Sequence, residues 1–139
     1  MDDQYNLQRF VLAQQPLFDM VCEELRRGSK RSHWMWFIFP QIEGLGHSPM
    51  AHKFAISSLA EASAYLAHPL LGPRLLECSR LVAAVDDRSA EDVFGYPDYM
   101  KFQSSMTMFS KAAPQQQVFR DCLQKYFGGV QDAATLDKL

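Results

Sequence analysis

The segment from Arg26 to Gln41 is the most informative part of this chain for its fold, and it reads RRGSKRSHWMWFIFPQ. Four cations fall within residues 26–31, and six apolar residues follow at 34–39, of which four are aromatic. A basic turn beside an aromatic segment can seat a ligand that has a phosphate at one end and a flat ring at the other. The same pattern also fits a solvated turn that leads into the core.

Composition limits what the whole chain can do. Its 139 residues indicate one domain large enough to bury a core. Apolar residues make up 47% of the chain and charged residues 22%, which is the profile of a globular protein. The formal net charge is −2, so no global basic field attracts nucleic acid or an anionic membrane. We therefore expect no membrane partner, rank nucleic acid low, and leave a protein partner open.

Cysteine and histidine usage predicts location and cofactors. No apolar run approaches the roughly 18 residues that cross a bilayer, and the acidic start MDDQ argues against a secretory signal. Cys22, Cys78 and Cys122 form no CxxC pair, which predicts buried, reduced thiols in a cytoplasmic protein. His47 and His52 do not share a helix face, and no cysteine or carboxylate cluster joins them. We therefore expect no metal site and no cofactor.

Helix punctuation predicts the fold class. Ser58 and Glu61 form a capping-box pattern, Ser89 and Asp92 resemble a second one, and Gly28 fits the residue just beyond a helix end. Little β pattern is visible elsewhere. The sequence therefore predicts a mainly α protein, a compact single-domain bundle of about seven or eight short helices over residues 1–139.

Residues 32–39 fit either a buried strand or a buried helix. Because no partner strand is evident, we favour a short helix with Ser32 as its N-cap. Lys30 and Arg31 would then lie beside the unpaired amides of a helix N-terminus, which together make an anion site. Phosphate binding at Lys30, Arg31 and Ser32 is one interpretation, and a solvated turn is the other.

Three neighbouring ring side chains are further candidates. On a helix Trp34 and Trp36 would point about 200° apart, so we expect one of them to line a cleft while the other joins the core. His33 follows the cations, which favour its neutral form and suit a general base near neutral pH. A structural histidine is the alternative.

A polar stripe is predicted near the end of the chain, within residues 98–107. Asp98, Lys101 and Ser105 lie at i, i+3 and i+7, and Ser104 adjoins Lys101. Such a stripe can hydrogen-bond a sugar or a phosphate, and Thr107 extends its set of hydroxyls. The alternative is an Asp–Lys surface pair that contributes little to stability.

The string KRSHWMWFIFPQ, followed by Gly44-Leu45-Gly46-His47-Ser48, closely resembles the signature of a bacterial family of unknown function that automated annotation often labels "calpastatin". The resemblance continues through residues 61–75 and 94–109, and it implies a compact helical domain without an established activity. True calpain inhibitors of that name are disordered and poor in aromatic residues, so the label does not fit this chain.

A more general similarity connects the chain with the NADAR group, helical proteins linked to NAD and ADP-ribose metabolism. An early tryptophan-containing element and the later Lys101-Phe102 pair carry this similarity. Some members of the group remove ADP-ribose from nucleobases, so the resemblance implies a class of ligand. It assigns no catalytic residue by position.

Two functions follow as hypotheses. In the first, the protein binds and hydrolyses a nucleotide-like ligand such as an ADP-ribose derivative, with Asp98 or His33 as acid or base at the N-glycosidic bond. The phosphate and the base of the ligand would contact the segment around the basic turn, and the ribose would contact the polar stripe. The residues expected to bind the ligand are Lys30, Arg31, Ser32, Trp34, Trp36, Gln41, Lys101, Ser104, Ser105 and Thr107. In the second, a non-catalytic module uses Arg26–Arg31 to contact a protein or nucleic-acid partner.

Overall fold

The computed structural model describes residues 3–139, and the prediction of a mainly α chain is confirmed there. Ten helices are present in this range: α1 Gln8–Gln14, α2 Phe18–Arg26, α3 Met35–Ile38, α4 Pro49–Lys53, α5 Leu59–Ala67, α6 Leu71–Ala83, α7 Ala90–Phe94, α8 Asp98–Ala112, α9 Gln117–Phe127 and α10 Ala133–Lys138. The expected seven or eight was too low because α3, α4 and α7 are helices of only four or five residues. Helices this short persist only where caps and packing hold them.

Helix ends follow the predicted capping residues, with one exception in detail. Ser89 and Asp92 form a complete capping box. Ser58 accepts a hydrogen bond from the Glu61 amide at 3.2 Å, but the Glu61 carboxylate turns to the amide and hydroxyl of Ser57 at 2.9 and 2.8 Å. Only half of the capping box at Ser58 and Glu61 therefore forms, because the Glu61 carboxylate accepts from Ser57 instead.

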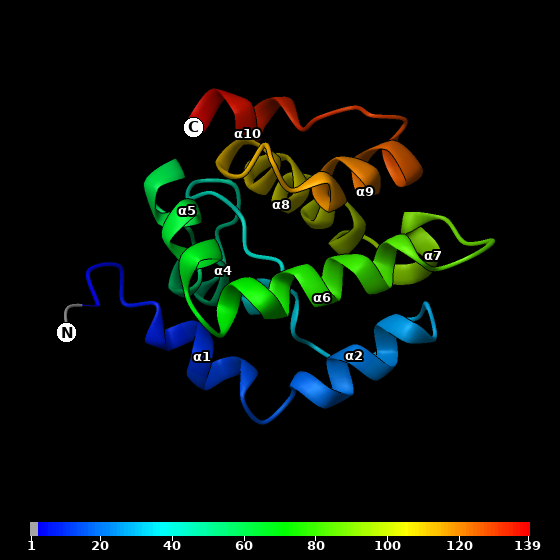
Figure 1. Cartoon of the computed structure of the whole chain (residues 1–139), viewed down its shortest axis with the longest axis horizontal. Coiled ribbons are helices and arrows are strands. Elements are labelled where there is room, and N and C mark those ends of the chain that lie inside the picture. The colour runs from blue at the N-terminus through cyan, green and yellow to red at the C-terminus, as the bar shows by residue number, and fades with distance from the viewer. Residues whose placement is uncertain (1–2) are drawn as a thin grey trace.

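Helix α6 crosses the middle of the bundle, with α1 and α2 on one side and α8, α9 and α10 on the other (Figure 1). Helix α8 packs against α5, α7, α9 and α10, while α2 and α5 pack against α6. The face of α8 that carries Phe102, Met106 and Phe109 is fully buried. The N-terminal turns of α8 are thereby held at a fixed position beside the segment that follows α2.

The aromatic segment at residues 34–39 lies in the core as a short helix, which settles the choice between strand and helix. Phe39 makes edge contacts with Phe94 at 5.9 Å and with Phe102 at 5.0 Å between ring centroids. Phe94 stacks on Phe102 at 4.6 Å, and Trp34 lies 6.3 Å from Phe39. Edge-to-face and offset pairs of this kind add to the energy of apolar burial. The segment therefore joins the basic turn to α7 and α8.

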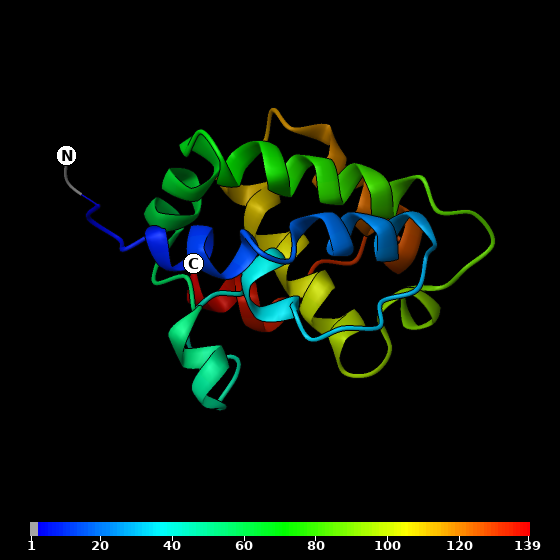
Figure 2. The same ribbon diagram turned by 90° about the horizontal axis from the view of Figure 1, so that it is seen from below.

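A looped excursion, residues 43–55, projects from the bundle and carries α4 (Figure 2). Its neck is closed by a parallel bridge in which the Glu43 amide donates to Ile56 O at 2.8 Å and the Ile56 amide donates to Gln41 O at 2.9 Å. The guanidinium of Arg9 donates to Lys53 O at 2.8 Å and is paired with Glu61 at 3.0 Å. The excursion is thus pinned to the bundle at its base.

Candidate functional site

The carboxylate of Glu24 fills the space beside the basic turn that a phosphate was expected to occupy. Its Oε1 atom accepts hydrogen bonds from the amides of Arg31 and Ser32 at 2.8 and 3.1 Å, and from Trp34 Nε1 at 2.9 Å. Its Oε2 atom accepts from the Ser32 hydroxyl at 2.7 Å. Glu24 is 7% exposed. An internal anion therefore uses the donors that the sequence analysis assigned to a ligand.

Two local expectations are corrected by this arrangement. Helix α3 begins at Met35 with Trp34 in the N-cap position and no side-chain cap, so Ser32 is not the N-cap. The Trp34 side chain is fully buried, which removes it as a stacking surface for a ligand. Arg31 and His33 are exposed and line none of the hollows described below.

Burial acts to raise the pKa of Glu24, but hydrogen bonds from the Arg31 amide, the Ser32 hydroxyl, the Trp34 indole and the Ser32 amide outweigh it. The net effect is a lowered pKa. A carboxylate with a lowered folded-state pKa stabilises the fold above its unfolded pKa of about 4.3. That contribution is lost as the pH falls through the lower folded-state pKa.

The basic turn and the polar stripe meet at Asp98, which pairs with a lysine from each. Lys30 Nζ lies 2.8 Å from Asp98 Oδ2, and Lys101 Nζ lies 3.4 Å from Asp98 Oδ1. The Lys30 side chain is only 8% exposed, whereas that of Lys101 is 27% exposed. One carboxylate thus joins two lysines that are 71 positions apart in sequence. Of the two lysines paired with Asp98, Lys30 is nearly buried and Lys101 is the one that solvent can reach.

Each lysine also covers a tryptophan ring. Lys30 Nζ lies 5.1 Å from the centroid of Trp34, and Lys101 Nζ lies 5.4 Å from that of Trp36. The Lys30 amide donates to Val93 O at 2.7 Å, which fixes the basic turn against α7. The indoles and Asp98 together restrict where both ammonium groups can lie.

Two connected hollows meet at Lys101. The inner hollow, with a volume of about 20 Å³, lies under the excursion and is lined by Met35, Trp36, Phe39, Gln41, Ile42, Gly44, Gly46, Ala51, His52, Phe54, Ala55 and Lys101. The outer groove, of about 270 Å³, is lined by Gln41, Leu45, Gly46, Tyr96, Pro97, Met100, Lys101, Gln103, Ser104, Asp132 and Ala134. They share Gln41, Gly46 and Lys101, so they are neighbours, and we refer to the two together as the cleft.

Gly46 is required where the two hollows meet. A Cβ atom at this position would lie 2.6 Å from Ala51 Cβ, closer than two carbon atoms can approach. The absence of a side chain therefore lets the excursion fold back on itself beside the cleft.

The three hydroxyl side chains of the predicted polar stripe lie in different surroundings. Ser104 Oγ donates to Met100 O at 3.1 Å and lies 3.2 Å from Asp132 Oδ2 at the floor of the outer groove. Thr107 is fully buried and donates to its own helix at Gln103 O. Ser105 is also fully buried, and its hydroxyl has no hydrogen-bond partner among residues 3–139. Of the three hydroxyls, only that of Ser104 lines the cleft.

Several lining residues were missed by sequence reasoning. Asp132, Tyr96 and Phe54 were not considered as lining residues, and His52 was considered only as a metal ligand. Asp132 shares the outer groove with Ser104 because α10 packs along α8. No spacing in the sequence marks this contact, since 28 residues separate the pair. The turn pattern around Gly44 and Gly46 was the available signal for the excursion.

No helix in the described part of the chain is long and apolar enough to cross a bilayer. Over the same residues, 3–139, no group of three or more histidine, cysteine, aspartate or glutamate side chains is placed to hold a metal ion. All three cysteines are buried and unpaired, and burial raises the pKa of Cys122 to about 12.

The sequence profile of a family described as a protein of unknown function (DUF1810) matches residues 4–139, and the chain belongs to this family. This chain is similar to the crystal structure of the conserved hypothetical protein Rv1873 from Mycobacterium tuberculosis. The similarity covers 99% of this chain and 98% of the chain of that protein. The two are 55% identical, with a TM-score of 0.97. A search of curated proteins finds no match. Nothing in these comparisons supports the calpastatin label or the NADAR similarity.

We expect Glu24→Gln to lower the free energy of unfolding by about 1–3 kcal/mol at pH 7, because a neutral amide replaces the shared acceptor of four donors. Urea unfolding followed by tryptophan fluorescence measures the effect. The difference between wild type and variant should shrink as the pH falls below the unfolded-state pKa of about 4.3 and through the lower folded-state pKa of Glu24. A difference that stays constant from pH 7 to pH 3 would contradict the role assigned to the Glu24 charge.

Proposed function

We propose that this protein binds a nucleotide-like ligand, such as an ADP-ribose derivative, in the cleft around Lys101. The observation that carries the proposal is the position of Lys101, a partly exposed ammonium group that lines both hollows and is held by Asp98 and Trp36. A positioned cation at the junction of two hollows suits an anionic group of a small ligand. The general similarity to the NADAR group supplies the class of ligand.

The sizes of the two hollows assign parts of the ligand to them. A volume of about 20 Å³ admits a water molecule or a small polar group but not a ring. The larger parts of the ligand therefore lie in the outer groove. Because Lys101 covers the ring of Trp36, Trp36 supports the cation rather than stacking on a base. Gln41 lines both hollows and offers an amide donor and an acceptor.

We extend the proposal to hydrolysis of an N-glycosidic bond. Asp98 keeps 19% of its side chain exposed beside Lys101, so water can reach its carboxylate. Asp98 would take a proton from water while the water oxygen bonds to C1′ of the ribose. The C1′–N bond breaks and its electron pair leaves with the base. Lys101 gives a proton to the departing nitrogen of a neutral nucleobase glycoside, whereas nicotinamide leaves NAD as a neutral base and needs no proton. Asp98 lines neither hollow itself but pairs with Lys101, which lines both, whereas His33 is exposed and lines neither hollow, so we assign His33 no step.

The alternative is a non-catalytic module that uses Arg26–Arg31 to contact a protein or nucleic acid. Arg26 and Arg27 both pair with Glu23, at 3.5 and 3.1 Å, and Lys30 is buried against Asp98. These pairs reduce the charge that the turn offers to a partner, so we rank this function second. RNA or DNA binding with a steep salt dependence would favour it. With three buried thiols, we also propose a cytoplasmic location.

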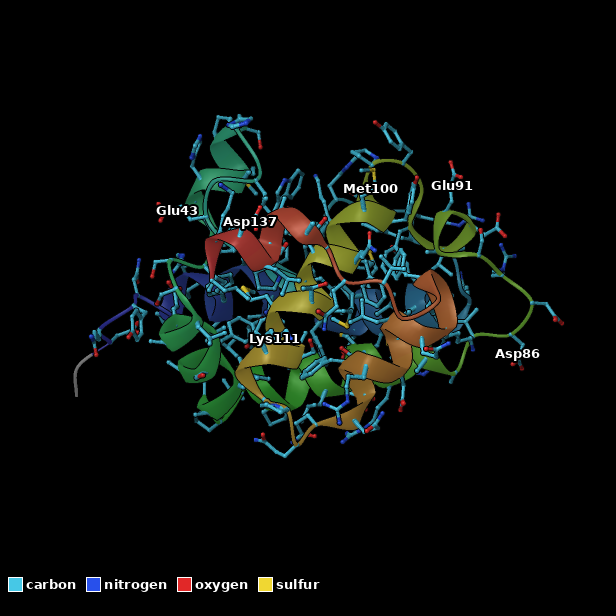
Figure 3. The ribbon with its side chains drawn as sticks, turned by 90° about the horizontal axis from the view of Figure 1, so that it is seen from above. Glu43, Asp86, Glu91, Met100, Lys111 and Asp137 are labelled. Carbon is cyan, nitrogen blue, oxygen red and sulfur yellow. The ribbon has the colours of Figure 1, made fainter. Side chains whose placement is uncertain are left out.

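We expect Lys101→Met to weaken binding of ADP-ribose by about tenfold or more, because a charge-assisted hydrogen bond is lost. Isothermal titration calorimetry with ADP-ribose, NAD and nucleoside phosphates measures the affinity. Lys111→Met is the matched control, since Lys111 is exposed near the other end of α8 (Figure 3). Equal affinities for the two variants, or no wild-type binding at millimolar ligand, would remove the proposal.

We expect Asp98→Asn to slow release of free base from an N-glycosidic substrate such as NAD by about 100-fold or more, because the amide cannot take a proton from water. Chromatography of the products measures the rate, and calorimetry checks that ADP-ribose still binds. A rate that falls only in proportion to affinity would make Asp98 a positioning residue for Lys101, and an unchanged rate would exclude it from catalysis.

A further inference from the structure

The outer groove contains a second anchored polar group, Asp132, which caps the N-terminus of α10. The Asp132 Oδ2 atom accepts from the Thr135 amide at 3.0 Å and from the Thr135 hydroxyl at 2.6 Å, and it lies 3.2 Å from Ser104 Oγ. Its backbone amide donates to Thr107 Oγ1 at 2.9 Å. The two bonds from Thr135 fix the side chain and the amide bond fixes the backbone, while Oδ1 has no hydrogen-bond partner among residues 3–139. One carboxylate oxygen is thus held in place as an unused acceptor.

The same groove is also lined by apolar side chains that are open to solvent. Tyr96 is 72% exposed and Met100 is 47% exposed, and Pro97 lies between them in sequence. Figure 3 labels Met100 on α8 and Asp137 on α10, the two helices that contribute to the groove. A ligand in the groove would therefore meet both these apolar side chains and the polar groups of Asp132, Ser104 and Lys101.

Three kinds of occupant can be compared with this arrangement. An apolar ligand would leave both Lys101 and the Asp132 oxygen desolvated without partners, which costs free energy. A bare anion would suit Lys101 but would meet the negative charge of Asp132. A sugar phosphate satisfies both groups, because its hydroxyls donate to the carboxylate, its phosphate meets the ammonium, and its C–H face packs on Tyr96 and Met100.

We infer that the outer groove is a sugar subsite that takes a ribose phosphate, and that Asp132 accepts hydrogen bonds from its vicinal hydroxyls. This inference rests on the proposed function, since it assigns the sugar of the nucleotide-like ligand to a place beside Lys101. Asp132 then accepts hydrogen bonds from the sugar hydroxyls, and the side chain of Tyr96 packs beneath the sugar ring.

The substitution Asp132→Asn tests the role of the Oδ1 atom as an acceptor without removing the cap of α10. The amide oxygen can keep the bonds from Thr135, and asparagine is as good an N-cap as aspartate, so α10 is preserved. The amide nitrogen then replaces Oδ1, and a donor faces the groove instead of an acceptor. Calorimetry with ribose 5-phosphate and 2-deoxyribose 5-phosphate, on wild type and variant, measures whether the hydroxyl at C2 is recognised through this atom.

We expect wild type to bind ribose 5-phosphate about tenfold more tightly than the deoxy compound, and Asp132→Asn to abolish that preference. Tyr96→Ala should weaken both sugars several-fold, whereas Leu12→Ala, which truncates an apolar side chain on α1 that is 66% exposed, should change neither. Urea unfolding of each variant checks that the fold is intact.

A preference for ribose that survives in Asp132→Asn, or no preference in wild type, would overturn the inference. The proposed function is judged separately by ADP-ribose. Wild-type binding of ADP-ribose with unchanged affinity in Asp132→Asn would leave the proposed function standing and remove the sugar subsite. Binding of ribose 5-phosphate through Asp132 without binding of ADP-ribose would retain the subsite and exclude the larger ligand.

Discussion

The carboxylate of Asp98, shared by Lys30 and Lys101, is the interaction on which the candidate site depends. It joins the turn after α2 to the first turn of α8, so two segments far apart in sequence meet at one point. Because Lys30 is nearly buried, removing either partner would leave a charge poorly compensated. The pair therefore fixes the place of Lys101, and Lys101 in turn defines where the two hollows of the cleft meet.

Glu24 explains why the most basic segment of the chain is not its best anion site. Four donors of the turn converge on this one carboxylate, so the turn is satisfied from within. Glu23 similarly pairs with the two arginines that close α2. Arg26, Arg27 and Arg31 stay exposed at the surface but line neither hollow, whereas Lys101 lines both and is held beside an indole and a glutamine.

The helical class and most helix ends could be predicted, because capping depends on residues a few positions apart. Ser89 with Asp92, Gly28 after α2, and Asp132 before α10 all act locally. The burial of Trp34 could not be predicted, since its indole is held by Glu24, a residue that no motif singles out. The groove between Ser104 and Asp132 likewise depends on how α10 packs along α8, which is a tertiary contact without a local signal.

We propose a ligand site at Lys101, and we infer that the backbone donors of the turn at Arg31 and Ser32 are already used by Glu24. A crystal structure of the protein grown with millimolar ADP-ribose tests this most directly. The expected result is a ligand in the cleft with a polar atom within about 3 Å of Lys101 Nζ, and with Glu24 still bound to the amides of Arg31 and Ser32. A ligand phosphate seated on those amides, with Glu24 displaced and the cleft empty, would contradict the account.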